Sequence, residues 1–149
     1  MQDHLPFSVT VEVRDRCLCL SLQRAARAIG RRFDEALRPL DLSNGQYSLL
    51  MALNRPEPPR MAEVARFLAM DRTTLTANLK PLARRGLLDI NPDQKDRRSR
   101  RLSLTEAGRR LLAQAVPIWR ETHDEIDTRV ASGDVAGLRR DLQSLSFGT

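Results

Sequence analysis

The stretch DRTTLTANLKPLARRGLLDINPDQKDRRSRRLSLTEAG, residues 71–108, predicts a helix, a charged hairpin and the start of a second helix. Asp71 is a favourable N-cap residue, and Gly86 suits the left-handed position that follows a helix. Between them, three leucines recur at helical spacing and form an apolar stripe: Leu75, Leu79 and Leu82. We therefore expect a helix over residues 71–85 with one buried face.

Two short β-candidates follow this helix, LLDI at 87–90 and RRLSL at 100–104. The turn between them is strongly basic, because one Lys and four Arg lie within positions 95–101. By itself, such a run is consistent with a disordered basic tail, a solvated turn or a nucleic-acid contact. Its ordered flanks, with Thr105 as a candidate N-cap of the next helix, favour a β-hairpin with a basic tip.

The segments on either side complete a winged helix-turn-helix. RMAEVARFLA (60–69) is a short amphipathic helix, and a tight turn joins it to the helix that starts at Asp71. LSNGQYSLLMAL (42–53) predicts an apolar helix capped by Ser43 or Asn44. The predicted fold is therefore mainly α with a small β-hairpin wing.

Long helices are expected outside this unit. Apolar positions recur from about Val13 to Leu37, which predicts a single helix of ~25 residues and ~37 Å. A helix of that length suggests an arm that packs against another subunit. From Thr105 a second long helix should bend at Pro117, and a last helix uses apolar residues between 135 and 145.

The charge is concentrated in one part of the chain. The net charge is +6, and residues 60–110 contain 13 Lys and Arg against 6 Asp and Glu, whereas the remainder contains 12 against 13. This local excess indicates an anionic partner. No apolar run approaches 18 residues and no signal-peptide pattern is present, so we expect a soluble, cytoplasmic protein without a membrane partner.

DRTTLTANLKPLARRGLL (71–88) followed by DRRSRRLSLTEAG (96–108) resembles the MarR family of bacterial transcriptional regulators. In the second motif the matching residues are Asp96, Arg98, Leu104, Thr105 and Gly108. The resemblance covers about residues 15–145. It implies a homodimeric repressor that binds double-stranded DNA sequence-specifically and reads two half-sites of a pseudo-palindrome about one helical turn apart.

The resemblance also divides the chain. Residues 1–40 form an N-terminal segment and dimerisation helix, residues 41–108 the winged helix-turn-helix DNA-binding lobe, and residues 109–149 the C-terminal dimerisation helices. In this division the flanking helices join the two protomers, and the central lobe contacts DNA.

On the 71–85 helix, the stripe opposite the leucines carries small and basic residues. Short Thr and Ala side chains let a helix approach base edges in the major groove, while Lys and Arg reach phosphates or guanine. Many family members carry Arg where this chain has Ala77, so base readout shifts toward Thr76, Lys80 and the wing. The predicted contact residues are Arg72, Thr73, Thr74, Thr76, Ala77, Lys80 and Arg84. A merely solvated helix face is the alternative.

In the wing, the resemblance places Arg98 in the minor groove, with Arg97 beside it. Asp96 would repel phosphate, so we expect it to orient an Arg. The remaining basic residues of the turn are expected to contact phosphates and to add salt dependence: Lys95, Arg100 and Arg101.

Two cysteines, Cys17 and Cys19, raise the question of redox control. On one helix they would lie about 200° apart, which places them poorly for chelating one metal or pairing within one chain. The organic-hydroperoxide-sensing, OhrR-like branch of the family resembles this chain in having a Cys at the position of Cys19. Its Tyr partners are replaced here by Phe33 and Asn44, so a structural Cys remains an alternative.

The usual effectors of the family are small, often aromatic anions bound between the dimerisation helices and the DNA-binding lobe. Phe33, Trp119 and His123 are candidate pocket residues, although at helical spacing such residues are more often core or surface. We expect no cofactor, no metal site and no enzymatic activity, because neither a nucleophile–base motif nor a phosphate-binding Gly-rich loop is present.

Two other functions use the same features. A non-specific nucleic-acid-binding or architectural protein would use the basic surface without reading sequence, and a winged helix that binds another protein would carry it incidentally. Affinity for a selected duplex, compared with random duplex, distinguishes these classes.

Overall fold

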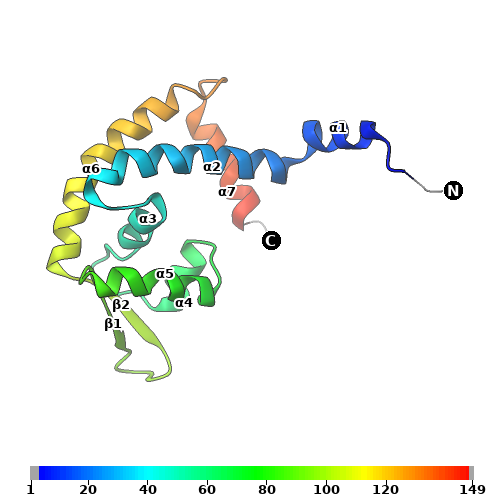
Figure 1. Ribbon diagram of the computed structural model, residues 1–149. Helices are drawn as coiled ribbons and strands as arrows, with labels where there is room; N and C mark the ends of the chain where they lie inside the picture. Colours follow the sequence, from blue (N-terminus) through cyan, green and yellow to red (C-terminus); the bar gives the residue numbers. More distant parts are fainter. Residues whose placement is uncertain (1–3, 148–149) are drawn as a thin grey trace.

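The computed structural model describes residues 4–147, which form seven α-helices, a 3₁₀ turn and a two-stranded sheet within that range (Figure 1). In chain order the elements are α1 Phe7–Arg16, α2 Leu18–Leu37, η1 Arg38–Leu40, α3 Asn44–Ala52, α4 Met61–Phe67, α5 Arg72–Arg84, β1 Leu88–Pro92, β2 Arg100–Leu104, α6 Glu106–Asp127 and α7 Val135–Phe147. Helices α3, α4 and α5 form a lobe from which the hairpin projects, while α1 extends away from the body. The mainly helical fold with a small wing is confirmed.

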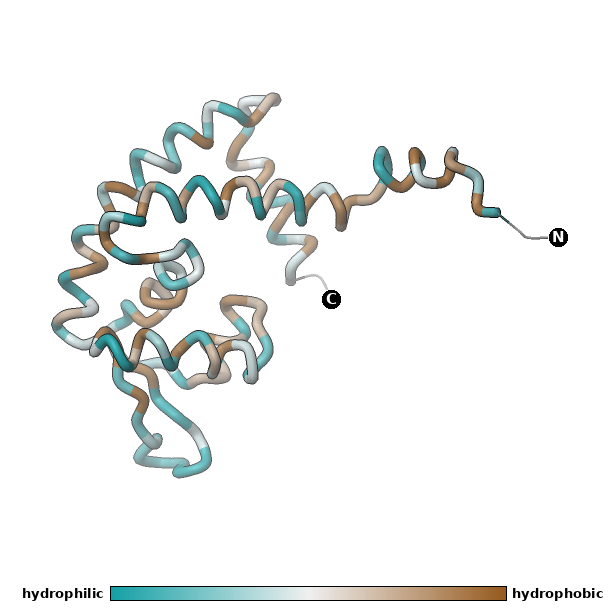
Figure 2. Tube along the Cα trace, in the orientation of Figure 1, coloured by the Kyte–Doolittle hydropathy of each residue, from teal (hydrophilic) through white to brown (hydrophobic). Residues whose placement is uncertain are grey.

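The core of the lobe is aliphatic, and the predicted stripe of α5 lies at its centre. Leu75, Leu79 and Leu82 are fully buried, and they pack with buried residues of α3, α4 and the hairpin. Leu102 of β2 is also fully buried. Figure 2 shows the consequence along the hairpin, which is hydrophobic near its base and hydrophilic at its tip.

Local capping chemistry sets the helix ends as expected. Ser43 caps α3 through a capping box with Gln46, so Ser43 and not Asn44 is the N-cap. Asp71 caps α5 by accepting a hydrogen bond from the backbone N–H of Thr74 at 2.8 Å. Gly86 follows α5 with φ +71°, the left-handed conformation that glycine adopts without strain.

The hairpin is anchored at its base to the start of α4. Its antiparallel register pairs Leu88 with Leu104 and Pro92 with Arg100. Beyond this ladder, the N–H of Leu102 donates to the carbonyl of Pro59 at 3.0 Å. A two-stranded hairpin is marginally stable alone, so these contacts with the preceding loop help to hold the wing on the lobe.

The prediction of a single long N-terminal helix is wrong, because the helix breaks at Cys17. This residue is extended, with φ −75° and ψ 104°, and its N–H donates to the carbonyl of Val13. Its thiol accepts a hydrogen bond from the N–H of Leu20 and so caps α2. The 200° separation from Cys19 therefore does not apply, because the two cysteines do not share one continuous helix.

Apolar side chains remain exposed on the flanking helices. They are Phe7 and Val13 on α1, Leu18, Leu22 and Ile29 on α2, and Leu138, Leu142 and Leu145 on α7. The long helix α6 starts after Thr105, as expected, and Pro117 lies inside it. No helix within residues 4–147 is both long enough and apolar enough to cross a membrane.

Candidate nucleic-acid interface

The outer face of α5 presents small and basic side chains to solvent. Thr73, Thr76, Ala77, Lys80 and Arg84 are all exposed, on the side opposite the buried leucines. The short Thr and Ala side chains at the start of this face admit close approach by a flat or grooved partner, and Lys80 and Arg84 lie further along it.

The three threonines of α5 differ in what their hydroxyls do. The hydroxyl of Thr74 donates to Asp71 at 2.7 Å and belongs to the cap. The backbone N–H of Thr74, together with this hydroxyl, lowers the pKa of Asp71. The hydroxyl of Thr76 donates to the carbonyl of Arg72 at 2.8 Å. Thr74 is therefore engaged at the helix end. The hydroxyl of Thr76 faces two acceptors within the protein, the carbonyl of Arg72 and, at 3.8 Å, the sulfur of Met61 on α4.

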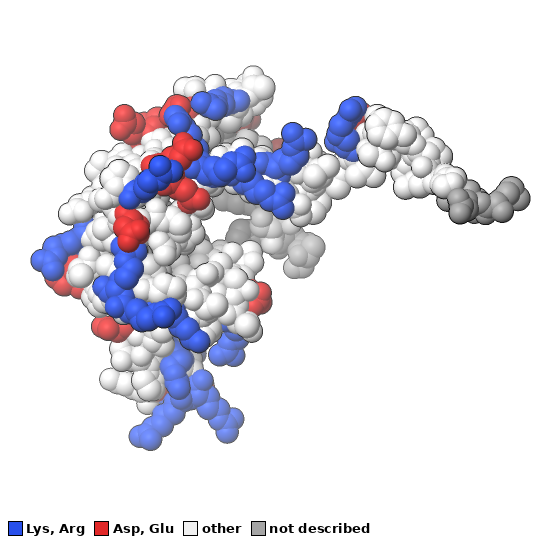
Figure 3. All heavy atoms as spheres, viewed as in Figure 1, with Lys and Arg blue, Asp and Glu red and all other residues white. Residues whose placement is uncertain are grey.

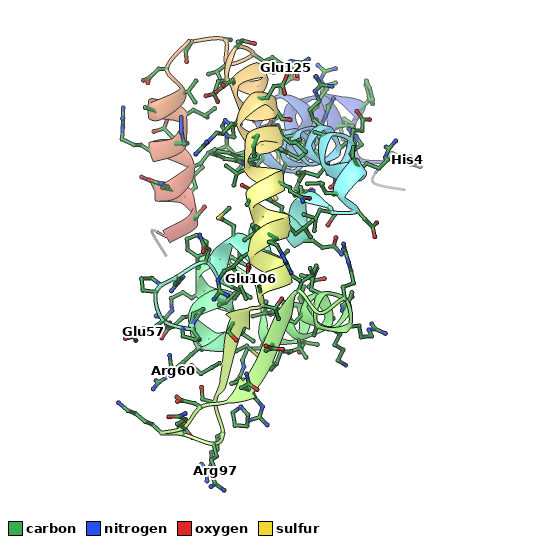
Figure 4. All side chains as sticks on the ribbon, turned by 90° about the vertical axis from the view of Figure 1, so that its left-hand side faces the viewer. His4, Glu57, Arg60, Arg97, Glu106 and Glu125 are labelled. Atoms are coloured by element: carbon green, nitrogen blue, oxygen red, sulfur yellow. The ribbon has the colours of Figure 1, made fainter. Side chains whose placement is uncertain are left out.

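The tip of the hairpin is ordered by Asp96. Its carboxylate accepts a hydrogen bond from the backbone N–H of Arg98 at 3.0 Å, and its carbonyl accepts one from Ser99 at 2.9 Å. Asp96 thus orients Arg98 through the backbone. The guanidinium of Arg100 donates to the carbonyl of Arg97 at 3.0 Å. Figure 4 places Arg97 at the outer end of the hairpin, pointing away from the lobe.

A buried carboxylate, which the sequence analysis missed, lies at the base of the basic turn. Asp93 is only 4% exposed, and its oxygens lie 3.2 Å from Nε of Arg60 and 3.5 Å from Nε of Arg101. The backbone N–H of Lys95 donates to it at 3.3 Å. This hydrogen bond, together with the two guanidinium groups, lowers the pKa of Asp93.

Arg101 consequently differs from the other basic residues of the turn. Besides its pair with Asp93, its guanidinium donates to the carbonyl of Pro58 at 2.8 Å. Lys95, Arg97 and Arg98 extend into solvent instead. Figure 3 shows basic side chains gathered at the hairpin tip and along the neighbouring lobe, with most acidic side chains of that face lying toward α2 and α6.

Comparison with known proteins identifies the family of this chain. The model of the MarR family matches residues 40–99, which include α3 to α5 and most of the hairpin. The Mycobacterium tuberculosis transcriptional regulator MosR, solved in complex with DNA, is 39% identical, with a TM-score of 0.80 over 88% of this chain and 94% of that one. The chain belongs to the MarR family.

Two further relatives span nearly the same length. The regulator SarZ of Staphylococcus aureus strain MRSA252 is 28% identical over 82% of this chain and 84% of its own. The repressor CouR, solved bound to a DNA duplex, is 26% identical with a TM-score of 0.79, covering 97% of this chain and 99% of that one. These proteins are transcriptional regulators, and the similarity extends beyond the winged lobe into the flanking helices.

A cavity of about 300 Å³ lies between α2, α3 and α6 of this MarR-family chain. Phe33 and Trp119 line it, together with Tyr47, which the sequence analysis did not single out. The rings of Tyr47 and Trp119 stack with centroids 6.3 Å apart, and burial raises the pKa of Tyr47. His123 does not line the cavity but packs on Trp119, with centroids 5.0 Å apart.

The two cysteines lie elsewhere. Cys19 is exposed and accepts a hydrogen bond from the side chain of Gln23 at 3.4 Å, whereas Cys17 is half-buried at the start of α2. Neither lines the aromatic cavity. Asn44, at a position where a thiol partner was considered, binds Asp34 through both its backbone and side-chain N–H groups. Residues 4–147 contain no cluster of three or more His, Cys, Asp or Glu that could hold a metal ion.

Proposed function

We propose that this protein is a homodimeric repressor that binds a pseudo-palindromic DNA site through α5 and the wing. The proposal rests on one observation: α5 exposes a face of small and polar side chains, and the adjacent hairpin has an ordered basic tip. α5 enters the major groove, while Arg98, flanked by Arg97, enters the adjacent minor groove. MosR and CouR, which were solved with DNA, support duplex DNA as the partner.

Homodimerisation is supported by the exposed apolar residues of α1, α2 and α7. These side chains lie outside the lobe's core, and a second copy of the chain would cover them. A two-fold dimer would present its two α5 helices about one helical turn of DNA apart, ~34 Å. The dimer thereby accounts for a palindromic site.

Competition between duplexes tests the function. DNA fragments selected by the protein from the host genome should bind at least about 10³-fold more tightly than random duplex at physiological salt. Equal affinities would instead identify a non-specific or architectural protein. Absence of duplex binding even at low salt would favour the protein-interaction winged helix.

Release from DNA is proposed to come from a small aromatic effector in the Phe33–Tyr47–Trp119 cavity, or from oxidation of Cys19 as in the OhrR-like branch. CouR of Rhodococcus jostii has been solved bound to p-coumaroyl-CoA, which supports an aromatic ligand. The exposure of Cys19 supports the oxidative route. Hydroperoxide that released Cys19→Ser from DNA as efficiently as the wild type would eliminate Cys19 as the sensor.

The hydroxyl geometry of Thr76 predicts which feature of a base it reads. Because its hydroxyl donates within the protein, to the carbonyl of Arg72, Thr76 should offer its methyl group to a thymine methyl rather than donate to a base edge. Replacing that thymine by deoxyuridine should weaken binding about fourfold, since one buried methyl is worth about 0.8 kcal/mol.

Two matched variants check this reading of Thr76. Thr76→Val keeps the methyl and should remain sensitive to deoxyuridine, whereas Thr76→Ser keeps only the hydroxyl and should lose that sensitivity. Binding measured with each thymine of the selected site replaced in turn decides the point. The methyl contact is wrong if Thr76→Ser discriminates thymine from deoxyuridine as well as the wild type does.

A further inference from the structure

Asp93 is a buried carboxylate within the surface that is proposed to bind DNA, and DNA is itself negatively charged. An exposed carboxylate there would repel phosphate, but Asp93 is 4% exposed and faces two guanidinium groups. Its lowered pKa means that it remains ionised at neutral pH. The carboxylate therefore interacts with arginines of the protein and is not exposed to DNA.

The two arginines that meet at Asp93 come from different elements. Arg101 lies on β2, and Arg60 is the N-cap residue of α4, the first helix of the helix-turn-helix. Residues 60 and 101 also form an isolated antiparallel bridge. Without a carboxylate between them, two like charges would face each other where the wing meets α4. Figure 4 shows Arg60 beside the base of the hairpin.

The position of the wing tip is determined by the contacts at the base of the hairpin. The hairpin is a two-stranded ladder that projects from the lobe, and within residues 4–147 no other helix or strand lies beside its tip (Figure 1). A small rotation at the base would displace Arg97 and Arg98 from the groove they are proposed to enter. Holding them in place before binding avoids an ordering cost when DNA binds.

We propose that Asp93 is a positioning residue that fixes the wing on α4 through Arg60 and Arg101, so that the tip and α5 engage their grooves together. The proposal rests on the DNA-binding function proposed above. According to this proposal, the side chain of Asp93 strengthens DNA binding although it carries a negative charge.

The sign of the effect of Asp93→Asn separates positioning from net charge. Removing one negative charge from a DNA-binding surface should strengthen binding if long-range electrostatics dominates. Positioning predicts the opposite, a loss of about tenfold in affinity for the selected duplex. Asp89→Asn, an exposed position on the same hairpin, is the matched control and should bind as well as the wild type or slightly better.

A double-mutant cycle then tests whether Asp93 acts through the tip. In the wild type, Arg98→Ala should clearly lower the affinity for the selected duplex. In the Asp93→Asn background it should lower the affinity by less than about twofold more, because the displaced tip has already lost its contact. Lys80→Ala on α5 should keep its full effect in both backgrounds. Full additivity of Arg98→Ala with Asp93→Asn would overturn the proposal, and so would tighter binding by Asp93→Asn.

Arg101→Gln provides a second route if Asp93→Asn does not fold. Arg101 is partly exposed, and the substitution removes its ion pair with Asp93 while leaving the pair between Asp93 and Arg60. This variant should show the same non-additivity with Arg98→Ala. Additivity in that background also overturns the proposal. If the wild type itself binds no selected duplex, the proposed function fails, an outcome distinct from a wild type that binds while the cycle is additive.

Discussion

Gly108→Ala is expected to destabilise the protein by about 3 kcal/mol, although it replaces a glycine inside a helix. A Cβ at this position would lie 2.1 Å from the carbonyl oxygen of Leu87 and 3.2 Å from a methyl carbon of Leu104. Helix propensity alone predicts the opposite sign, a gain of about 1 kcal/mol. Steric overlap with a backbone atom should exceed that gain, because no side-chain rotation can relieve it.

The Leu87 carbonyl has little freedom to move away. It accepts a hydrogen bond from the N–H of Thr105 at 3.2 Å, at the junction of the hairpin and α6. The hydroxyl of Thr105 donates to the carbonyl of Gly86 at 2.6 Å and accepts from the N–H of Gly108 at 3.0 Å. The Leu-Thr-x-x-Gly motif is thus a close packing of α6 against the end of α5, with glycine at the point of contact.

Urea denaturation of two glycine variants measures the effect. Gly45→Ala is the matched control, because Gly45 lies in the first turn of α3 and its nearest neighbour, the hydroxyl of Ser43, is 3.9 Å from a Cβ. It should be neutral or stabilising by up to about 1 kcal/mol. A Gly108→Ala protein as stable as Gly45→Ala would show that the junction relaxes and that the contact does not constrain α6.

The parts of this fold that could be predicted are those determined by neighbouring residues. The leucine stripe of α5, its Asp71 cap and the glycine after it are all local patterns. The hairpin was predicted because two short β-candidates flank the basic turn and Thr105 starts a helix directly after them. The break at Cys17 was missed because a thiol is an uncommon N-cap and apolar spacing continues on both sides of it.

Contacts between distant segments could not be predicted in the same way. Asp93 is 33 positions from Arg60 in the sequence, and only the packing of the wing on α4 brings them together. Tyr47 was seen as part of an apolar helix, but its stacking on Trp119 depends on how α3 meets α6. Apart from Arg101, which is paired with Asp93, the predicted DNA contacts are exposed residues of two adjacent elements, so their local placement followed once the helix and hairpin were correct.

Removing both tip arginines is expected to have the largest effect on DNA binding. In the proposed dimer, Arg97→Gln/Arg98→Gln removes four positive charges from the surface that is proposed to contact DNA. If each releases about 0.9 counterions, the slope of log affinity against log salt should become shallower by about 3 to 4. Because the two lines converge near 1 M salt, this corresponds to a loss on the order of 10³-fold at 0.1 M.

The location of the charge, and not its amount, should decide this result. Arg139→Gln/Arg140→Gln removes the same charge from exposed positions on α7, outside the proposed DNA-binding surface. It should leave the slope of log affinity against log salt unchanged. Filter binding or fluorescence anisotropy across a salt series measures both variants on the same duplex. If the two pairs reduced the slope equally, the protein would attract DNA through its net charge and the wing would not be a contact. A reduction confined to the wing pair would instead place the tip against DNA, because counterion release requires proximity to the phosphates.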